Sequence, residues 1–190
     1  MKVAKRPATY EDLLQVPDNL VAEIVEGELY ASPRPGGAHG RAEGAIHSRL
    51  RFFFDDGGGP GGWWIADEPE LHLGSDVLVP DVCGWRRSRV PTYPVTGAAA
   101  TIAPDWICEV LSPRTGILDR TRKLPAYARH GVAYAWLVDP PLRTIDVYRL
   151  IDGRWSLLVT HGGDETARIE PFEQIEFPLA TLWVPTPDPA

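Results

Sequence analysis

Cysteines and long apolar runs are scarce in this chain, which limits the classes of protein it can belong to. Its two cysteines, Cys83 and Cys108, lie in apolar, strand-like segments without the C-x-x-C spacing of a zinc knuckle. We therefore expect small buried side chains rather than a disulfide framework or a zinc site. Crossing a bilayer takes roughly 18 apolar residues, and no run approaches that length. The first segment, MKVAKRPATYEDLLQVP, lacks the apolar core of a signal peptide, so the sequence predicts a cytoplasmic protein with no membrane partner.

Positive charge is also in deficit. The chain has 19 Lys and Arg residues against 26 Asp and Glu residues, and this formal net charge of -7 argues against a nonspecific nucleic-acid coat protein. The distribution is uneven, because the tail from Asp164 onward is acidic whereas the segment from Ser112 to Gly131 is basic. The basic residues of this segment, residues 112–131, are Arg114, Arg120, Arg122, Lys123 and Arg129. A second basic cluster consists of Arg86, Arg87 and Arg89. These side chains could either contact phosphate groups or simply lie on a solvated surface, and the sequence leaves both roles open.

The first part of the chain alternates between helical and strand patterns. Hydrophobic residues make up 44% of the 190 residues, which suits a single domain over residues 1–190 with a full core. Thr9 is a suitable N-cap for a helix through Val16, with Asp12 at the capping-box position. Glu26-Gly27 then separates two alternating runs and predicts a β-hairpin. The next pattern is helical, with apolar residues at three- and four-residue steps until the loop DDGGGPGG, namely Ala42, Ile46, Leu50 and Phe53.

Strand patterns dominate the rest of the chain. Strands are expected at WWIAD, ELHLG and DVLVPDVCGW, and then at DWICEVL. A basic helix that ends at Gly131 precedes YAWLVD, TIDVYRL and RWSLLVT, with Asp152-Gly153 as a turn. This order predicts a mixed central β-sheet flanked by helices, in the α/β to α+β range.

Glu109 lies in the middle of the segment ICEVLSP, which otherwise suits a buried strand and the turn that ends it. A carboxylate there either points into water or loses several kcal/mol on desolvation, unless it is paired or bound to a metal. Asp105 lies on the same strand but about 13 Å away, too far to share one ion. Asp81, which follows Pro80 on another strand, could come close enough. These two carboxylates with the backbone carbonyl of Val110 would suit Mg²⁺.

Four segments of the chain resemble a known family. They are TYEDLLQVPDNLVAEIVEGELYASPRPGGAH, VLVPDV, APDWICEVLSP and DRTRKLPAYARHGVAYAWLVDP. In order and spacing, from about Thr9 to Trp183, they resemble the Uma-two family of restriction endonucleases, within the PD-(D/E)XK nuclease superfamily. The resemblance implies a restriction-endonuclease-like core, Mg²⁺ or Mn²⁺ as the cofactor and DNA as the partner.

The resemblance also implies roles for individual residues. Asp81 corresponds to the aspartate of the PD element, and Glu109 to the acid of the (D/E)XK element. Leu111 stands where the lysine of that element is expected, as is typical of this family. A lysine on the following helix is thought to serve instead, and the matching residue is Lys123. Glu23 matches an acid of the family's N-terminal hairpin that would complete the site, whereas an ordinary hairpin acid would face solvent.

Lys123 also has a chemical role that does not depend on the resemblance. Phosphodiester hydrolysis develops negative charge on the phosphate oxygens, and a metal ion with a neighbouring cation stabilises that charge. Asp119, Lys123 and Tyr127 recur at four-residue steps, which predicts one helical face directed at the ICEVLSP strand. Pro125 disfavours a regular helix here. The helix should therefore begin near Thr121 or kink at Pro125.

The second predicted helix offers a rival metal site. His39, Glu43 and His47 would align on one face of this helix and favour a transition metal such as zinc. His39 also matches a histidine that is frequent in the family, so contact with substrate or a helix cap is the alternative. We assign substrate binding to His39, Arg114, Arg120 and Arg122. The tryptophans are expected in the core or an interface, namely Trp63, Trp64, Trp136 and Trp155.

These patterns predict a metal-dependent endonuclease that hydrolyses DNA phosphodiester bonds. The alternative is a catalytically inactive protein that keeps the nuclease fold as a nucleic-acid-binding or assembly module. A homodimer is also expected, because two sites related by a two-fold axis can cut both strands of a duplex.

Overall fold

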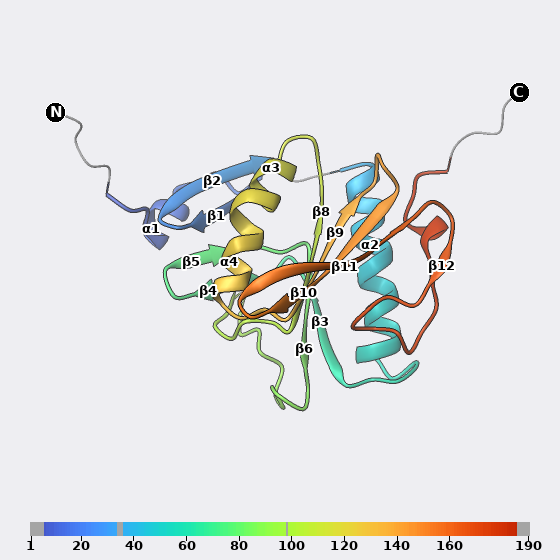
Figure 1. Ribbon diagram of the computed structural model, residues 1–190. Coiled ribbons are helices and arrows are strands. Elements are labelled where there is room, and N and C mark those ends of the chain that lie inside the picture. The colour runs from blue at the N-terminus through green and yellow to red at the C-terminus, as the bar shows by residue number, and fades with distance from the viewer. Residues whose placement is uncertain (1–5, 34–35, 98, 186–190) are drawn as a thin grey trace, which may run out of the picture.

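The computed structural model describes residues 6–33, 36–97 and 99–185. At its centre is a six-stranded mixed sheet in the order β11-β10-β9-β8-β6-β3 (Figure 1). Strands β8 and β9 run parallel, and the other neighbouring pairs run antiparallel. The strands are β3 (Trp63–Asp67), β6 (Val82–Arg86), β8 (Trp106–Val110), β9 (Tyr134–Asp139), β10 (Thr144–Ile151) and β11 (Arg154–Gly162). The predicted mixed sheet with helices packed on it is confirmed.

A second sheet has the order β2-β1-β5-β4-β7 and lies on the α4 side of the first (Figure 1). The predicted hairpin is present, and its turn residues Glu26 and Gly27 have φ values of 52° and 75°. Positive φ at both central residues is what a two-residue hairpin turn with the right twist requires. The strands are β1 (Leu20–Val25), β2 (Glu28–Pro33), β4 (Glu70–Leu73), β5 (Asp76–Leu78) and β7 (Ala99–Ala100).

The segment DVLVPDVCGW is two strands rather than the one that was expected. Its first part is β5 of the second sheet, and its last part is β6 of the six-stranded sheet. Pro80 lies between them, and a proline has no N–H to donate to a strand neighbour. Asp81 therefore lies where the chain passes from one sheet into the other.

Helix α1 (Tyr10–Leu13) begins where the sequence predicts but ends early. The backbone N–H of its N-cap, Thr9, donates to Asp12 Oδ2 at 2.8 Å, as a capping box requires. The expected end at Val16 is wrong. Leu14 is 60% exposed, and Pro17 disfavours helical geometry at Val16, the residue before it, so the helix ends early.

Helix α2 (Ala38–Leu50) buries the predicted apolar face and continues into a π-helical turn, η1 (Arg51–Asp55). In a π turn the hydrogen bonds reach one residue further than in an α-helix. Because of this wider turn, the core receives Phe54, which is fully buried, while Phe53, the predicted core residue, is only partly buried.

The basic helix is continuous across Pro125, without a start at Thr121. It consists of α3 (Gly116–Leu118), a π turn η2 (Asp119–Lys123) and α4 (Leu124–Arg129). Pro125 follows the π turn directly. The irregular hydrogen bonding of that turn accommodates a residue that lacks an N–H.

Strand β8 is buried on both faces, as is usual for a strand between covered neighbours. Trp106, Cys108 and Val110 join the cluster that packs against α2, whereas Ile107 and Leu111 join the cluster under α4 and the second sheet. Both free cysteines of the chain are buried, as expected. A polar side chain on β8 therefore enters a desolvated environment.

The C-terminal segment completes the core on the α2 side. It contains β12 (Thr166–Ala167), β13 (Phe177–Pro178) and a 3-10 turn, η3 (Leu179–Thr181). The Phe172 ring packs against Trp63, Trp106 and Trp136. Trp63 and Trp136 are thus core residues, as predicted.

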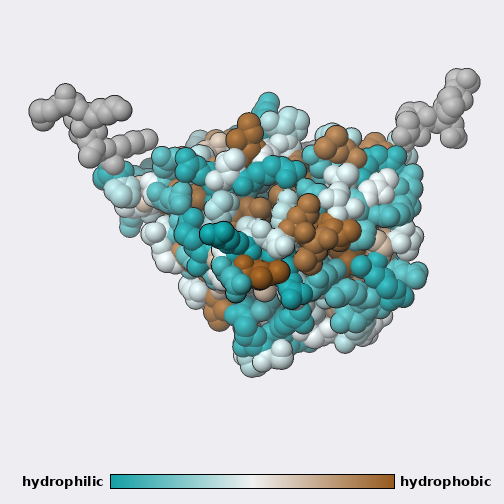
Figure 2. Space-filling view, in the orientation of Figure 1, coloured by the Kyte–Doolittle hydropathy of each residue, from teal (hydrophilic) through white to brown (hydrophobic). Residues whose placement is uncertain are grey.

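The visible surface is largely hydrophilic, and a hydrophobic patch lies over the region of the β10–β11 hairpin (Figure 2). The edge strand β11 exposes Leu157, Leu158 and Val159. Among the residues described, no helix is long and apolar enough to cross a membrane.

Candidate active site

The two acids singled out from the sequence line the same cavity at the end of β8. Strand β6 pairs antiparallel with β8, and Val82 lies opposite Cys108. Asp81 directly precedes Val82 and so lies next to this end of the pairing. Asp81 Oδ2 accepts a hydrogen bond from the Val110 backbone N–H at 2.6 Å, which ties the Asp81 carboxylate to β8.

The Glu109 side chain points to the face that carries α4 and is 2% exposed. Its Oε1 accepts a hydrogen bond from the Tyr127 hydroxyl at 2.6 Å, and its Oε2 accepts one from Lys123 Nζ at 3.0 Å. Burial raises the pKa of Glu109 well above its ordinary value, against the opposing effect of the Lys123 charge. Glu109 is therefore a buried acid with partners, not a solvent-facing one.

Lys123 comes from the π turn η2 and is 3% exposed. Besides Glu109, its ammonium contacts the Val79 carbonyl oxygen at 3.0 Å and Glu23 Oε1 at 2.9 Å. Burial alone would lower the pKa of Lys123, but the charges of Glu109 and Glu23 outweigh burial and hold the pKa well above its ordinary value. Lys123 is thus a fixed cation whose three donors have protein partners.

Two further acids complete the wall around Lys123. Glu23 is buried, and besides contacting Lys123 it accepts a hydrogen bond from the Val79 N–H at 2.7 Å, so it does not face solvent. Asp119 is also buried, with Oδ1 3.9 Å from Lys123 Nζ. Burial raises the pKa of Asp119 from 3.8 to about 6, although Lys123 opposes this rise.

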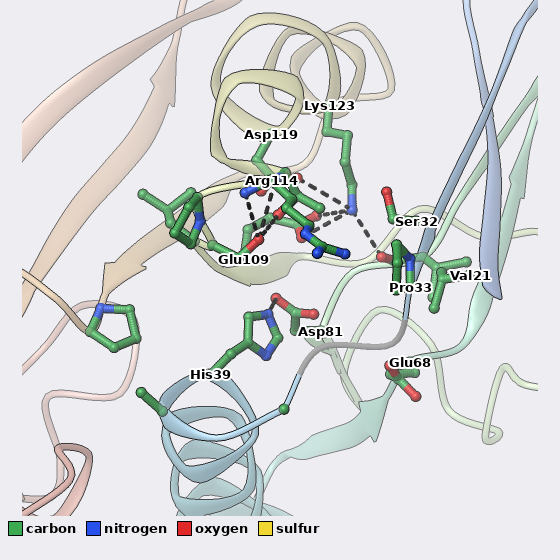
Figure 3. A pocket seen from close by; sticks show the side chains of 18 of the residues that line it. Val21, Ser32, Pro33, His39, Glu68, Asp81, Glu109, Arg114, Asp119 and Lys123 are labelled. Carbon is green, nitrogen blue, oxygen red and sulfur yellow. Dashed lines mark hydrogen bonds and ion pairs between the residues drawn. The ribbon is translucent and has the colours of Figure 1, made fainter. Parts of the chain in front are cut away.

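His39 approaches Asp81 from the opposite side, on the first turn of α2. Figure 3 shows Asp81 between His39 and the group formed by Glu109, Asp119 and Lys123. His39 Nε2 lies 3.3 Å from Asp81 Oδ2, and Nδ1 lies 3.6 Å from Glu43 Oε2. Burial lowers the pKa of His39, but Asp81 and Glu43 outweigh it and raise the pKa to about 10.

The rival trio on α2 is only partly assembled. His39 and Glu43 do lie together, but their third neighbour is Asp81. His47 lies instead near Asp67, with Nε2 3.6 Å from Oδ1. The helical spacing correctly places His39 beside Glu43, whereas the third partner comes from a segment distant in sequence.

A cavity of about 390 Å³ opens over these groups. Arg114 lines it, and Figure 3 shows the Arg114 side chain next to the group formed by Glu109, Asp119 and Lys123. Arg120 and Arg122 are not among the described residues that line it. Arg120 pairs with Asp146 at 3.6 Å and Arg122 pairs with Glu26 at 3.2 Å, both on the exposed side of the helix. The predicted basic set is therefore split between the cavity and the outer surface.

The arrangement fits a divalent metal ion. Four acidic residues line the cavity, namely Glu23, Asp81, Glu109 and Asp119, whereas the basic residues next to them are Lys123 and His39. Converging carboxylates raise one another's pKa values, and binding a cation relieves this repulsion. Mg²⁺ prefers such oxygen donors, takes one or two carboxylates and keeps several waters.

Sequence reasoning did not place Glu43 beside Asp81, and it directed Tyr127 at the ICEVLSP strand without naming the Glu109 carboxylate as its partner. The four-residue spacing of Asp119, Lys123 and Tyr127 was a usable signal for Tyr127, because all three are buried on one helical face. No local pattern pointed from Glu43 to Asp81.

Solved structures define the class of this fold. The chain is similar to a crystal structure described as a "putative nuclease belonging to DUF820" from Anabaena variabilis, with a TM-score of 0.73. The two share 24% sequence identity, and the match covers 93% of this chain and 97% of the other. The fold is therefore that of this nuclease-like structure.

The family follows from the sequence match. Residues 7–181 match the Uma2 (Uma-two) family, which is described as "Putative restriction endonuclease", so the chain belongs to this family. No curated protein matches the chain.

Proposed function

We propose that this chain is a Mg²⁺- or Mn²⁺-dependent endonuclease that hydrolyses phosphodiester bonds in DNA, with residues 1–190 acting as one domain. The observation that carries this proposal is the excess of carboxylates around Lys123 at the floor of the cavity. Glu109 and Asp119 are almost fully buried there, and burial raises the pKa of both. Such a site is stabilised when a divalent cation binds to it.

Asp81, Glu109 and the backbone carbonyl of Val110 would hold the ion. When bound, a divalent metal lowers the pKa of a coordinated water and stabilises charge on a phosphoryl oxygen. The hydrogen bond from the Val110 N–H fixes the Asp81 carboxylate, and the Tyr127 hydroxyl fixes Glu109. These contacts hold both acids in place before substrate arrives.

Lys123 and Glu23 would act together on the other side of Glu109. The three N–H donors of Lys123 already contact Val79, Glu109 and Glu23. Lys123 would therefore stabilise the negative charge that develops on the phosphate by its positive charge, without a direct hydrogen bond. Glu23 keeps the ammonium in position.

Arg114 at the cavity is suited to a DNA phosphate. Arg120 and Arg122 would contact the phosphate backbone outside the cavity. Their exposed ion pairs with Asp146 and Glu26 are weak, so a DNA phosphate would replace the carboxylate in each pair. We also propose that the enzyme works in the cytoplasm and as a homodimer, which can cut both strands of a duplex.

Cleavage of DNA tests this function. Supercoiled plasmid, linear duplex and single-stranded DNA are incubated with the protein in Mg²⁺, Mn²⁺ or EDTA. The wild type should cleave DNA only with metal, and Glu109→Gln should lower the rate by roughly 100-fold or more. Glu173→Gln is the matched control, because Glu173 is exposed and far in sequence from the site residues.

The control variant should cleave at the wild-type rate. If the wild type cleaves none of the substrates with either metal, the inactive nuclease-fold module becomes the better account.

A further inference from the structure

A groove of about 460 Å³ adjoins the candidate active site. It lies between the start of the basic helix, α3 and η2, and the turn that joins β9 to β10. Four residues line both this groove and the cavity over the acids, namely Leu111, Ser112, Pro113 and Pro141. A DNA strand with one phosphate in the cavity would therefore bring the next nucleoside to the groove.

Two exposed apolar side chains line this groove. Ile117 on α3 is 78% exposed and Leu142 in the β9–β10 turn is 71% exposed, the two highest values among the exposed large hydrophobic residues that the structure describes. A single exposed leucine is normal on a protein surface. Two such side chains from different segments, on one groove beside buried acids, indicate a binding surface.

The backbones that carry these two side chains are fixed. The Leu142 N–H donates to Asp139 Oδ1 at 3.1 Å, and the Thr121 hydroxyl donates to the Ile117 carbonyl oxygen at 2.6 Å. Neither hydrogen bond involves the apolar side chain itself. Ile117 and Leu142 are therefore in position before a ligand arrives, which lowers the entropy cost of binding.

Positive charge lies on either side of Ile117 in the sequence. Arg114 lines the cavity and Arg120 lines the groove. The ion pair of Arg120 with Asp146 has a distance of 3.6 Å and a 42% exposed arginine, so it is weak. Arginine suits phosphate, and the face of a base suits an apolar surface. The groove thus matches a nucleotide chain, in which charged phosphates alternate with bases.

Polar groups in the groove suit the edge of a base. Besides Arg120, they belong to Ser112, Thr121 and Asp139. A base that leaves the stack is recognised by hydrogen bonds to its edge and by packing against apolar or aromatic side chains. The groove supplies both kinds of contact.

We propose that the groove lined by Ile117 and Leu142 holds one unstacked base of the DNA strand, next to the phosphate in the cavity. This rests on the proposed function in one respect, namely that DNA occupies the cavity. Unstacking a base costs free energy, and the cost is least for a mismatched or single-stranded base. The favoured substrate is therefore single-stranded DNA, or a duplex with an unpaired base, over an intact duplex.

Equilibrium binding tests the groove separately from cleavage. Fluorescence anisotropy is measured with one labelled DNA sequence as a single strand, as an intact duplex and as a duplex with one unpaired base, at one low salt concentration. EDTA and Ca²⁺ are compared, because Ca²⁺ also binds carboxylate oxygens, and a gel establishes that the DNA stays intact. The wild type should bind the single strand and the mismatched duplex about 10-fold or more tightly than the intact duplex.

Ile117→Ser and Leu142→Ser change exposed positions, so both variants should fold. Each should weaken binding of the single strand by about 5- to 30-fold, because apolar area is no longer buried against the base. Binding of the intact duplex should change less. Leu14→Ser is the matched control, because Leu14 is 60% exposed and does not line the groove, and it should bind all three DNAs as the wild type does.

A mismatched duplex with 2-aminopurine as its unpaired base reports on the base directly. The fluorescence of this analogue rises when it leaves the stack. The wild type should raise the fluorescence on binding, and the double variant Ile117→Ser/Leu142→Ser should not.

The possible failures are distinguishable. Equal wild-type affinities for single strand and intact duplex, or groove variants that bind like Leu14→Ser, would overturn the base site, while metal-dependent plasmid cleavage would still support the proposed function. The expected binding pattern without cleavage of any substrate would support the base site and overturn hydrolysis. If the wild type binds no DNA in either buffer, the base site is overturned and the cleavage assay alone decides the function. Self-association that Ile117→Ser abolishes, seen by sedimentation, would assign the groove to a second copy instead.

Discussion

Replacing Lys123 with methionine removes the buried charge while keeping most of the side-chain volume. Lys123 Nζ lies 2.9 Å from Glu23, 3.0 Å from Glu109 and 3.9 Å from Asp119, at 3% exposure. Taking one partner from a buried ion pair costs about 3–5 kcal/mol, because the other partner is left uncompensated. We expect the metal-free protein at neutral pH to lose about that much free energy of unfolding.

The loss should shrink as the pH falls. Burial already raises the pKa of Glu109 above its ordinary value and that of Asp119 to about 6, and without Lys123 both pKa values rise further. A carboxyl group with a raised pKa in the folded state favours folding below its unfolded pKa, and loses this effect as pH rises through the folded pKa. From neutral pH down to about pH 5, the variant should therefore approach the wild type.

Urea unfolding in EDTA across this pH range measures the effect. Arg122→Met is the control, because its ion pair with Glu26 is exposed and should contribute less than about 1 kcal/mol. The double variant Lys123→Met/Glu109→Gln should recover part of the lost stability. A loss for Lys123→Met that is below about 1 kcal/mol, or that does not change with pH, would refute this reasoning.

Two further changes probe the same buried cluster. Because the pKa of Asp119 is raised from 3.8 to about 6, this group should make the wild type lose up to about 3 kcal/mol of stability between pH 4 and pH 7, and Asp119→Asn should remove that dependence in urea titrations. An unchanged pH slope in the variant would contradict the raised pKa. Tyr127→Phe deletes the hydrogen bond to Glu109 and should lower the free energy of unfolding by about 1.5–3 kcal/mol, while a change under about 0.5 kcal/mol would mean that this contact is weak.

Local patterns were sufficient for the elements that depend on neighbours in sequence. The turns at Glu26-Gly27 and Asp152-Gly153 each join two paired strands, and both positions in each turn have positive φ. The elements that the sequence did not predict depend on tertiary packing. The π turn before Pro125 and the division of DVLVPDVCGW between two sheets have no periodic signal of their own.

The candidate site likewise combines contacts that local sequence patterns predict with contacts that depend on tertiary packing. Glu109 attracted attention because a carboxylate in a buried strand needs a partner, and the helical spacing pointed from Lys123 and Tyr127 to that strand. The contact of His39 with Asp81 could not be read in this way. It depends on how α2 packs on the sheet, which is set by core side chains distant in sequence.

The central claim is that Asp81 and Glu109 form a metal site, and melting with and without metal tests it without knowledge of the substrate. An ion at about 100 times its Kd adds about 2.7 kcal/mol to a protein that binds it only when folded. We predict that Mg²⁺ raises the Tm of the wild type relative to EDTA, and that Glu109→Gln loses most of this rise. A wild-type Tm that is the same in EDTA, saturating Mg²⁺ and saturating Mn²⁺ would contradict the claim.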